Sequence, residues 1–314
     1  LLSTFDNGIL VVPDLTIPDV IASFRDDPVT AIHADASTGT LYLGSSKGVL
    51  MQYANNQLIT LKSSGMRAIE CMVSNENFPY LIYDDGAIRA LDKRTGQSID
   101  ISTAALKDAA IVHPKLVYLG TNVGLLKCTW SDGALPEVSS VEDFRFRTHL
   151  VALQDPDLGI IASTSHGLFA IDTLDRGKKI LLNGEDIFPT AMANFDGQVL
   201  AATQNDGILI LKNDQVVGQI SPKNDRLEIL RKLFPFQNTI LAKSSHAVYQ
   251  FSKNGEVLKN ISKAYGFPAS RVFDFDMQGD RIWVSHAGGV QAVELSTTVS
   301  NQAIPDLQLA RIDV

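Results

Sequence analysis

Arginine and aromatic side chains recur in the segments that separate the apolar runs of this sequence. A guanidinium group binds a carboxylate or sulfate through paired hydrogen bonds, and a flat aromatic face stacks on a sugar ring. A cluster of both would suit an oligosaccharide or another small anionic ligand. In the alternative interpretation, the arginines pair with neighbouring acids and the rings fill gaps in the core. The candidate ligand-binding residues are Arg67, Phe144, Arg145, Arg147, Phe188, Arg226, Tyr265 and Arg271.

Residues typical of catalysis or metal binding do not group in this way. Three histidines, His166, His246 and His286, fall in predicted turns of different repeats, whereas zinc needs its ligands within about 2 Å. The carboxylate pair Asp84-Asp85 is typical of a solvated turn. The sequence contains no nucleophile elbow, phosphate loop or cysteine–histidine cluster. We therefore predict no catalytic residue, no metal site, no cofactor and no enzymatic activity.

The elements that position these side chains are short strands in a repeat, which is clearest at Ser270–Leu295. There, apolar runs at 271–276, 281–285 and 289–294 alternate with turn residues. Copies recur about every forty residues, which predicts an all-β fold, a β-propeller of four-stranded blades. A glycine with positive φ should open each third strand, with a different turn where alanine replaces it. These positions are Gly8, Gly48, Gly86, Gly124, Gly167, Gly207, Ala247 and Gly289.

The two ends of the chain bear on the number of blades. Leu307–Val314 alternates like a first strand, and Leu1–Phe5 resembles the second strand that should follow it. Paired, they would complete an eighth blade and leave no open sheet edge, so we favour eight blades over seven. Residues 1–314 then form a single domain closed by the N- and C-terminal strands. Because the sequence begins within a strand, we expect an excised or processed piece of a larger protein.

Composition narrows the range of partners. The formal net charge is −8 and basic residues are not grouped, which argues against nucleic acid. Apolar runs of about eighteen residues are absent, so we expect no membrane insertion by this segment. Cys71 and Cys128 fall on strands of different copies and should be free buried thiols. Trp283 lies in the middle of a second strand and should pack between blades.

Two copies carry a more specific signature. Phe267-Pro268 precedes a first strand, Ile282-Trp283-Val284 is an apolar second strand, and Gly289-Val290 opens the third. Leu119-Gly120-Thr121 with Gly124-Leu125 repeats the second half of that pattern. The sequence resembles the two-component regulator propeller repeat, although most copies lack the tryptophan and Gly-Thr, and rings of that family generally have seven blades.

This resemblance implies a ligand-binding sensor propeller that acts in signal transduction. Members usually form the periplasmic part of hybrid histidine kinases and detect oligosaccharides released from glycans, so the resemblance implies a periplasmic or extracellular location. It transfers no ligand residues, because the repeat is a scaffold signature. The alternative function is a non-catalytic platform that holds a protein partner on one propeller face.

Overall fold

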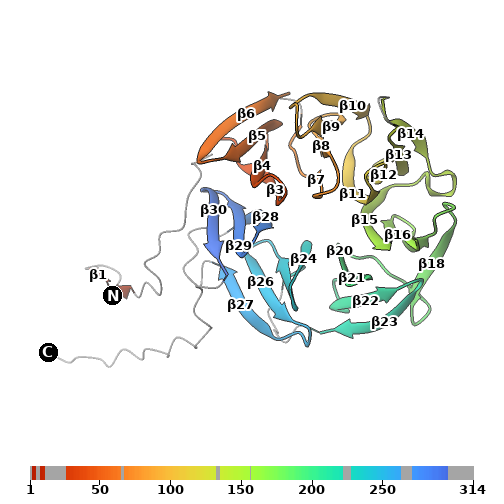
Figure 1. Cartoon of the computed structure of the whole chain (residues 1–314). Helices are drawn as coiled ribbons and strands as arrows, with labels where there is room; N and C mark the ends of the chain where they lie inside the picture. The colour runs from red at the N-terminus through yellow and green to blue at the C-terminus, as the bar shows by residue number, and fades with distance from the viewer. Residues whose placement is uncertain are drawn as a thin grey trace.

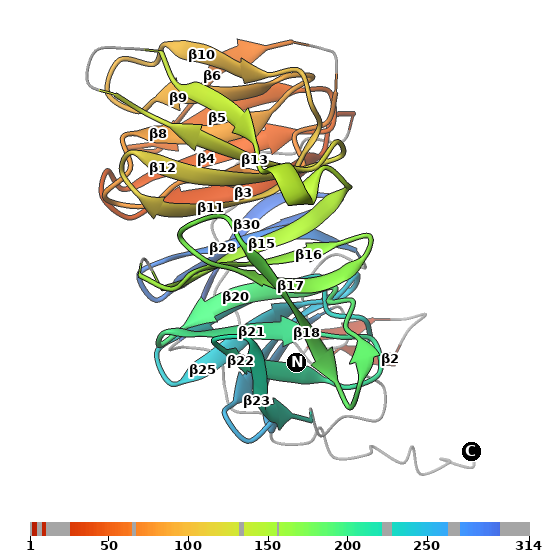
Figure 2. The same ribbon diagram turned by 90° about the vertical axis from the view of Figure 1, so that its right-hand side faces the viewer.

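The computed structural model describes residues 2–4, 8–10, 26–64, 67–131, 135–155, 157–221, 228–262 and 271–295. Seven antiparallel sheets surround a central channel (Figure 1), which confirms the predicted β-propeller. Figure 2 shows the ring edge-on, with the fourth blade toward the viewer. Within the described ranges no helix is long and apolar enough to cross a membrane.

The first three blades each contain four strands, ordered from the channel outward. The first blade comprises β3 (Val29–Asp35), β4 (Thr40–Ser45), β5 (Val49–Ala54) and β6 (Gln57–Ser63). The second comprises β7 (Met72–Val73), β8 (Tyr80–Asp84), β9 (Ile88–Asp92) and β10 (Ser98–Ser102). The third comprises β11 (Leu106–His113), β12 (Leu116–Thr121), β13 (Leu125–Thr129) and β14 (Glu137–Ser140).

The remaining four blades vary this plan. The fourth has an extra outer strand and comprises β15 (Thr148–Asp155), β16 (Gly159–Thr164), β17 (Gly167–Ile171), β18 (Gly177–Leu182) and β19 (Glu185–Asp186). The fifth comprises β20 (Ala191–Phe195), β21 (Gln198–Ala202), β22 (Ile208–Lys212) and β23 (Gln215–Ile220). The sixth comprises β24 (Lys232–Phe236), β25 (Thr239–Lys243), β26 (Ala247–Ser252) and β27 (Val257–Ser262). In the described residues the seventh comprises β28 (Val272–Gln278), β29 (Arg281–His286) and β30 (Gly289–Glu294).

The repeated glycine has the predicted conformation. Gly124 has φ +143°, and a Cβ there would lie 2.5 Å from the carbonyl oxygen of Phe144. Ala247 is not among the residues with positive φ, so its turn differs as expected. The other described glycines that share the positive φ are Gly48, Gly86, Gly167, Gly207 and Gly289.

The hydrophobic core lies between neighbouring blades. Ile82 and Ile88 of the second blade pack in one cluster with Val117 and Leu119 of the third, and all four are fully buried. Such clusters recur around the ring because each sheet presents apolar side chains on both faces. Burial of apolar surface between sheets is therefore the main force that stabilises the ring.

The seventh blade packs directly against the first, so the prediction of eight blades is wrong. Trp283 on β29 is only 3% exposed and meets the ring of Tyr53 on β5 edge-on at 6.0 Å. Carboxylates on β28 also bind backbone N–H groups of β3. These contacts leave no gap for another sheet, and they confirm that Trp283 is structural.

The N-terminal copy of the repeat was counted as part of an eighth blade, but it does not belong to the ring. β1 (Leu2–Thr4) pairs with β2 (Gly8–Leu10) in a separate two-stranded sheet. The expected partner of the N-terminal strand, Leu307–Val314, lies outside the described residues, so closure of the 1–314 domain by the two ends stays a prediction. The predicted free thiols are confirmed, with Cys128 buried on β13 and Cys71 half-buried just before β7.

Candidate functional site

One end of the ring carries both the connections between blades and the turns between second and third strands. The N–H of Ser165, in such a turn, donates to the carbonyl of Arg147 in a connection at 2.9 Å. The same contact joins Asn122 to Ala105 at 3.1 Å. We call this end the connection face. Loops on one end of a rigid ring are well placed to form a binding surface.

The four predicted arginines that the structure describes lie on this face but have different surroundings. Arg67 donates from Nη1 to Asp84 at 3.2 Å, and Arg145 approaches Glu142 at 4.0 Å. Arg147 is exposed, and the Arg271 guanidinium lies over the ring of Phe273 at 5.3 Å. The structure therefore does not gather the described arginines into one cluster. Arg226 and Tyr265 lie outside the described residues.

Two predicted aromatic residues, Phe144 and Phe188, do come together in a cavity at the outer part of the fourth blade. This blade-four cavity has a volume of about 570 Å³, within the range of small-molecule sites. Phe144 is buried, whereas Phe188 is 55% exposed, which is unusual for a large apolar ring. The residues that line the blade-four cavity are Asp143, Phe144, Phe146, Ser165, His166, Phe169, Gly177, Lys179, Asp186 and Phe188.

Local sequence explains the aromatic floor of the cavity. The single 3-10 turn η1 (Glu142–Phe144) places Phe144 against Phe169 of β17, edge-on at 5.3 Å. Gly177 at the start of β18 makes room for this ring, because a Cβ there would lie 2.2 Å from Cζ of Phe144. Phe146 lies 4.4 Å from the imidazole of His166, measured between ring centroids.

The polar wall of the cavity comes from the extra hairpin of the fourth blade. Lys179 on β18 pairs with Asp186 on β19, with Nζ 2.7 Å from the carboxylate. The same ammonium lies 5.9 Å from the centre of the Phe169 ring. The cavity thus combines apolar ring faces with a half-exposed ion pair, an arrangement that can stack on a ligand ring and hydrogen-bond its substituents.

Sequence reasoning missed Phe169, Lys179 and Asp186. The sequence does hold a signal for Lys179 and Asp186, the dipeptide Asn183-Gly184 that joins β18 to β19. Asn183 has φ 53° and Gly184 has φ 88°. Asn-Gly is a strong hairpin signal, since both positions of its turn need positive φ. The hairpin was hidden because the four-strand repeat leaves no place for a fifth strand.

A second, smaller cavity of about 230 Å³ lies between the second and third blades. Arg67, Asp84 and Lys107 line it, together with Glu70 and Cys71. Burial, with nearby carboxylates such as Asp108, raises the pKa of the Cys71 thiol well above its ordinary value. A thiol of this kind stays protonated at neutral pH and is a poor nucleophile.

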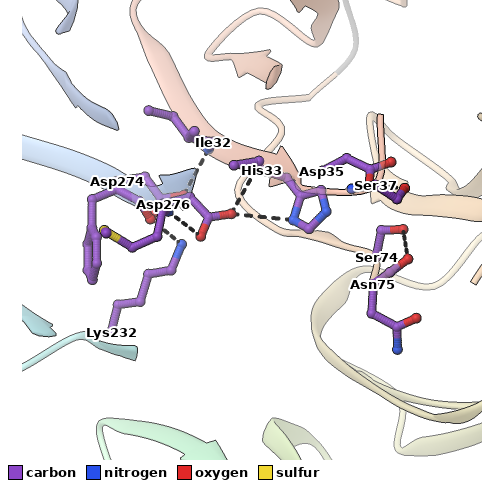
Figure 3. Close-up of polar contacts among 12 residues, drawn as sticks. Ile32, His33, Asp35, Ser37, Ser74, Asn75, Lys232, Asp274 and Asp276 are labelled. Carbon is purple, nitrogen blue, oxygen red and sulfur yellow. Dashed lines mark hydrogen bonds and ion pairs between the residues drawn. The ribbon is translucent and has the colours of Figure 1, made fainter. Parts of the chain in front are cut away.

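A charged network lines the channel where the ring closes (Figure 3). Asp274 on β28 accepts from Lys232 Nζ at 2.9 Å and from the N–H of Ile32 at 2.8 Å. Asp276 accepts from the N–H of Ala34 at 2.8 Å and lies 3.5 Å from Nδ1 of His33. Burial is the main cause that lowers the pKa of His33. Because each hydrogen bond has a partner in another blade, the network fixes the seam.

The turn histidines do not converge. His166 lines the blade-four cavity, His246 lies 2.6 Å from Glu228, and His286 is buried at the end of β29. In the part of the chain that the structure describes, no group of three histidine, cysteine or acidic side chains is placed to hold a metal ion.

Comparisons with known proteins support the fold. No protein-family model and no curated protein matches the sequence. The extracellular domain of a putative one-component system from B. thetaiotaomicron matches with a TM-score of 0.67 and 16% identity, over 88% of this chain and 39% of that chain. A second structure, described as the extracellular domain of a putative hybrid two-component system, gives the same values.

An enzyme shares the architecture. A catalytically inactive virginiamycin B lyase from Staphylococcus aureus, solved with quinupristin, matches with a TM-score of 0.71 and 7% identity, over 87% of this chain and 97% of the other. At these identities the likeness shows the fold alone. The present chain spans 39% of the length of the B. thetaiotaomicron sensor chains.

Proposed function

We propose that this chain is a non-catalytic, ligand-binding sensor propeller that detects glycan fragments outside the cytoplasm. The blade-four cavity is the observation that carries the proposal. An exposed Phe188 ring beside the Lys179–Asp186 pair offers a stacking surface next to hydrogen-bonding groups. The repeat signature at Leu119 and Trp283, and the extracellular sensor domains among the structural neighbours, support a role in signalling.

Calorimetry with a panel of neutral and acidic oligosaccharides tests this proposal. A stacked sugar would cover the exposed part of Phe188, so Phe188→Ala should weaken binding by about 1 to 2 kcal/mol, or about 5- to 30-fold. Leu174→Ala is the matched control, because Leu174 is 69% exposed in the turn at the other end of the same blade. Binding of an acidic member should weaken as salt rises, since Lys179 is solvent-exposed.

Two results would contradict the proposal. The first is that no member of the panel binds, and the second is that Phe188→Ala binds as the Leu174→Ala control does. Turnover of an oligosaccharide by the purified chain would contradict the non-catalytic assignment.

A second candidate function is a protein-interaction platform, and the outermost strands favour it. Apolar side chains are exposed there in four blades, at Ile59, Val138, Val217 and Leu258. An outer strand has one unpaired edge, and an exposed apolar side chain on it can contact a second chain that pairs there. Sequence that flanks this chain distinguishes the two candidates, because a following membrane helix and histidine kinase would favour the sensor.

A further inference from the structure

The inner strands of four blades share an irregularity close to the connection face. The pairing register of the first and second strands shifts between Val29 and Ala31, Leu106 and Asp108, Thr148 and Leu150, and Val272 and Asp274. A β-bulge leaves one residue outside the ladder and redirects its side chain. The residues in the bulge position are Thr30, Lys107, His149 and Phe273.

In the adjacent third and fourth blades the bulge residues are cationic or protonatable. Lys107 and His149 are both half-buried, and Arg147 precedes His149 by two residues. Burial is the main cause that lowers the pKa of His149, and the positive charges of Arg147 and Lys107 lower it further, so the imidazole is neutral at neutral pH and the lasting positive charges are those of Lys107 and Arg147. Like charges at one place repel each other unless an anion lies among them.

None of these three side chains makes a hydrogen bond or ion pair with another side chain or backbone group within the described ranges. By contrast, the half-buried lysines Lys232 and Lys93 do have such partners. Lys232 binds Asp274, and Lys93 binds Asp35 at 3.0 Å. A half-buried polar group without a protein partner needs a ligand or solvent to satisfy it.

The smaller cavity of about 230 Å³ gives such a ligand a place. Lys107 and Arg67 line it from neighbouring blades. Its buried acid, Asp84, already accepts from Arg67 at 3.2 Å, Leu106 N at 2.9 Å and Gly86 N at 2.8 Å. Arg67 has further N–H donors beyond the one on Asp84, and about half of its side chain is exposed. Glu70 is the remaining acid in the lining and is exposed.

We propose that the connection face carries a second site, separate from the blade-four cavity, that binds a small oxyanion between the second, third and fourth blades. Arg67 and Lys107 contact the anion, and Arg147 adds positive charge at its edge. The cavity is smaller than usual for a drug-sized ligand, so the ligand is a compact carboxylate, phosphate or sulfate, not an oligosaccharide. This site does not depend on sugar binding by the blade-four cavity.

Titration with defined anions tests the site. Sodium succinate, phosphate and sulfate are added to the full chain, with sodium chloride adjusted to keep ionic strength constant, and binding is followed by calorimetry and thermal shift. We expect saturable binding of at least one anion, and the comparison of succinate with phosphate and sulfate distinguishes a carboxylate site from a tetrahedral-anion site. Equal responses to all three salts and to chloride would overturn the proposal.

Variants locate the site. Lys107→Ala should weaken anion binding at least tenfold and Lys107→Arg should restore it, whereas Lys212→Ala, at an exposed lysine on β22, should leave it unchanged. Arg147→Ala gives an independent readout if Lys107→Ala fails to fold. Phe188→Ala should bind the anion as the parent does, which separates this site from the proposed oligosaccharide site. Unchanged affinity in both Lys107→Ala and Arg147→Ala would refute the assignment.

Discussion

Removal of the Asp274 carboxylate should open the seam between the last and first blades. This side chain is about nine-tenths buried and joins three blades, because it accepts from Lys232 of the sixth and from the N–H of Ile32 of the first. Asp274→Ala leaves both donors without this acceptor. Lys232 retains its bond to the carbonyl of Phe275 at 2.7 Å.

The expected cost follows from these contacts. A buried N–H without an acceptor costs about 1 to 3 kcal/mol, and breaking a fully buried ion pair costs about 3 to 5 kcal/mol. The side chain of Lys232 is 31% exposed, so water compensates part of the second cost. We therefore expect Asp274→Ala to lower the free energy of unfolding by about 3 kcal/mol.

A double-mutant cycle separates the stranded charge from the lost contacts. Asp274→Ala combined with Lys232→Met removes the unpaired ammonium, so the double variant should cost less than the sum of the two single variants. Urea-induced unfolding monitored by circular dichroism supplies the free energies. Asp206→Ala is the control, because Asp206 is exposed, has no positive φ, and its carboxylate has no ion pair within the described residues. An Asp274→Ala variant as stable as that control, or additive effects in the cycle, would contradict this role of Asp274.

Two further predictions concern the blade-four cavity and the channel. Gly177→Ala should lower the free energy of unfolding in urea by about 1 to 3 kcal/mol and weaken oligosaccharide binding, because the added Cβ displaces Phe144. Parent-like values of both the unfolding free energy and the affinity would contradict the close approach of Gly177 and Phe144. Burial raises the pKa of Asp108 from 3.8 to about 6, so this group contributes stability that is complete below pH 3.8 and is lost as the pH rises through 6. The difference amounts to about 2 to 3 kcal/mol, and Asp108→Asn should flatten the dependence of unfolding free energy on pH between about 4 and 6; an unchanged slope would refute it.

The repeat pattern was sufficient to predict the fold but not the number of blades. The glycine period identifies strands wherever it occurs, and it placed Trp283 correctly on a buried second strand. It cannot distinguish a hairpin inside the ring from one outside it, and Gly8 belongs to the separate sheet of β1 and β2. The number of blades depends on how the seventh blade packs against the first, which is a contact between residues far apart in the sequence.

The candidate site was predictable in part. Phe144 and Phe188, which line the blade-four cavity, were predicted because they lie in connections between blades, and these connections meet on one face of a propeller. Three of the arginines chosen by the same argument lie instead against an acid or a ring of their own surroundings: Arg67 against Asp84, Arg145 against Glu142 and Arg271 against Phe273. Lys179 and Asp186 were missed because they belong to a hairpin that departs from the repeat. The bulge at Lys107 depends on the pairing register, which the sequence does not display.

The structure of the chain with a bound oligosaccharide tests the proposed function most directly. The member of the panel that binds most tightly would be soaked into or co-crystallised with the parent chain. We predict a sugar ring stacked on Phe188, with hydroxyl groups in hydrogen-bonding distance of Lys179 or Asp186. A sugar bound in the channel, on the opposite face, or on the connection face away from Phe188 would contradict the proposal.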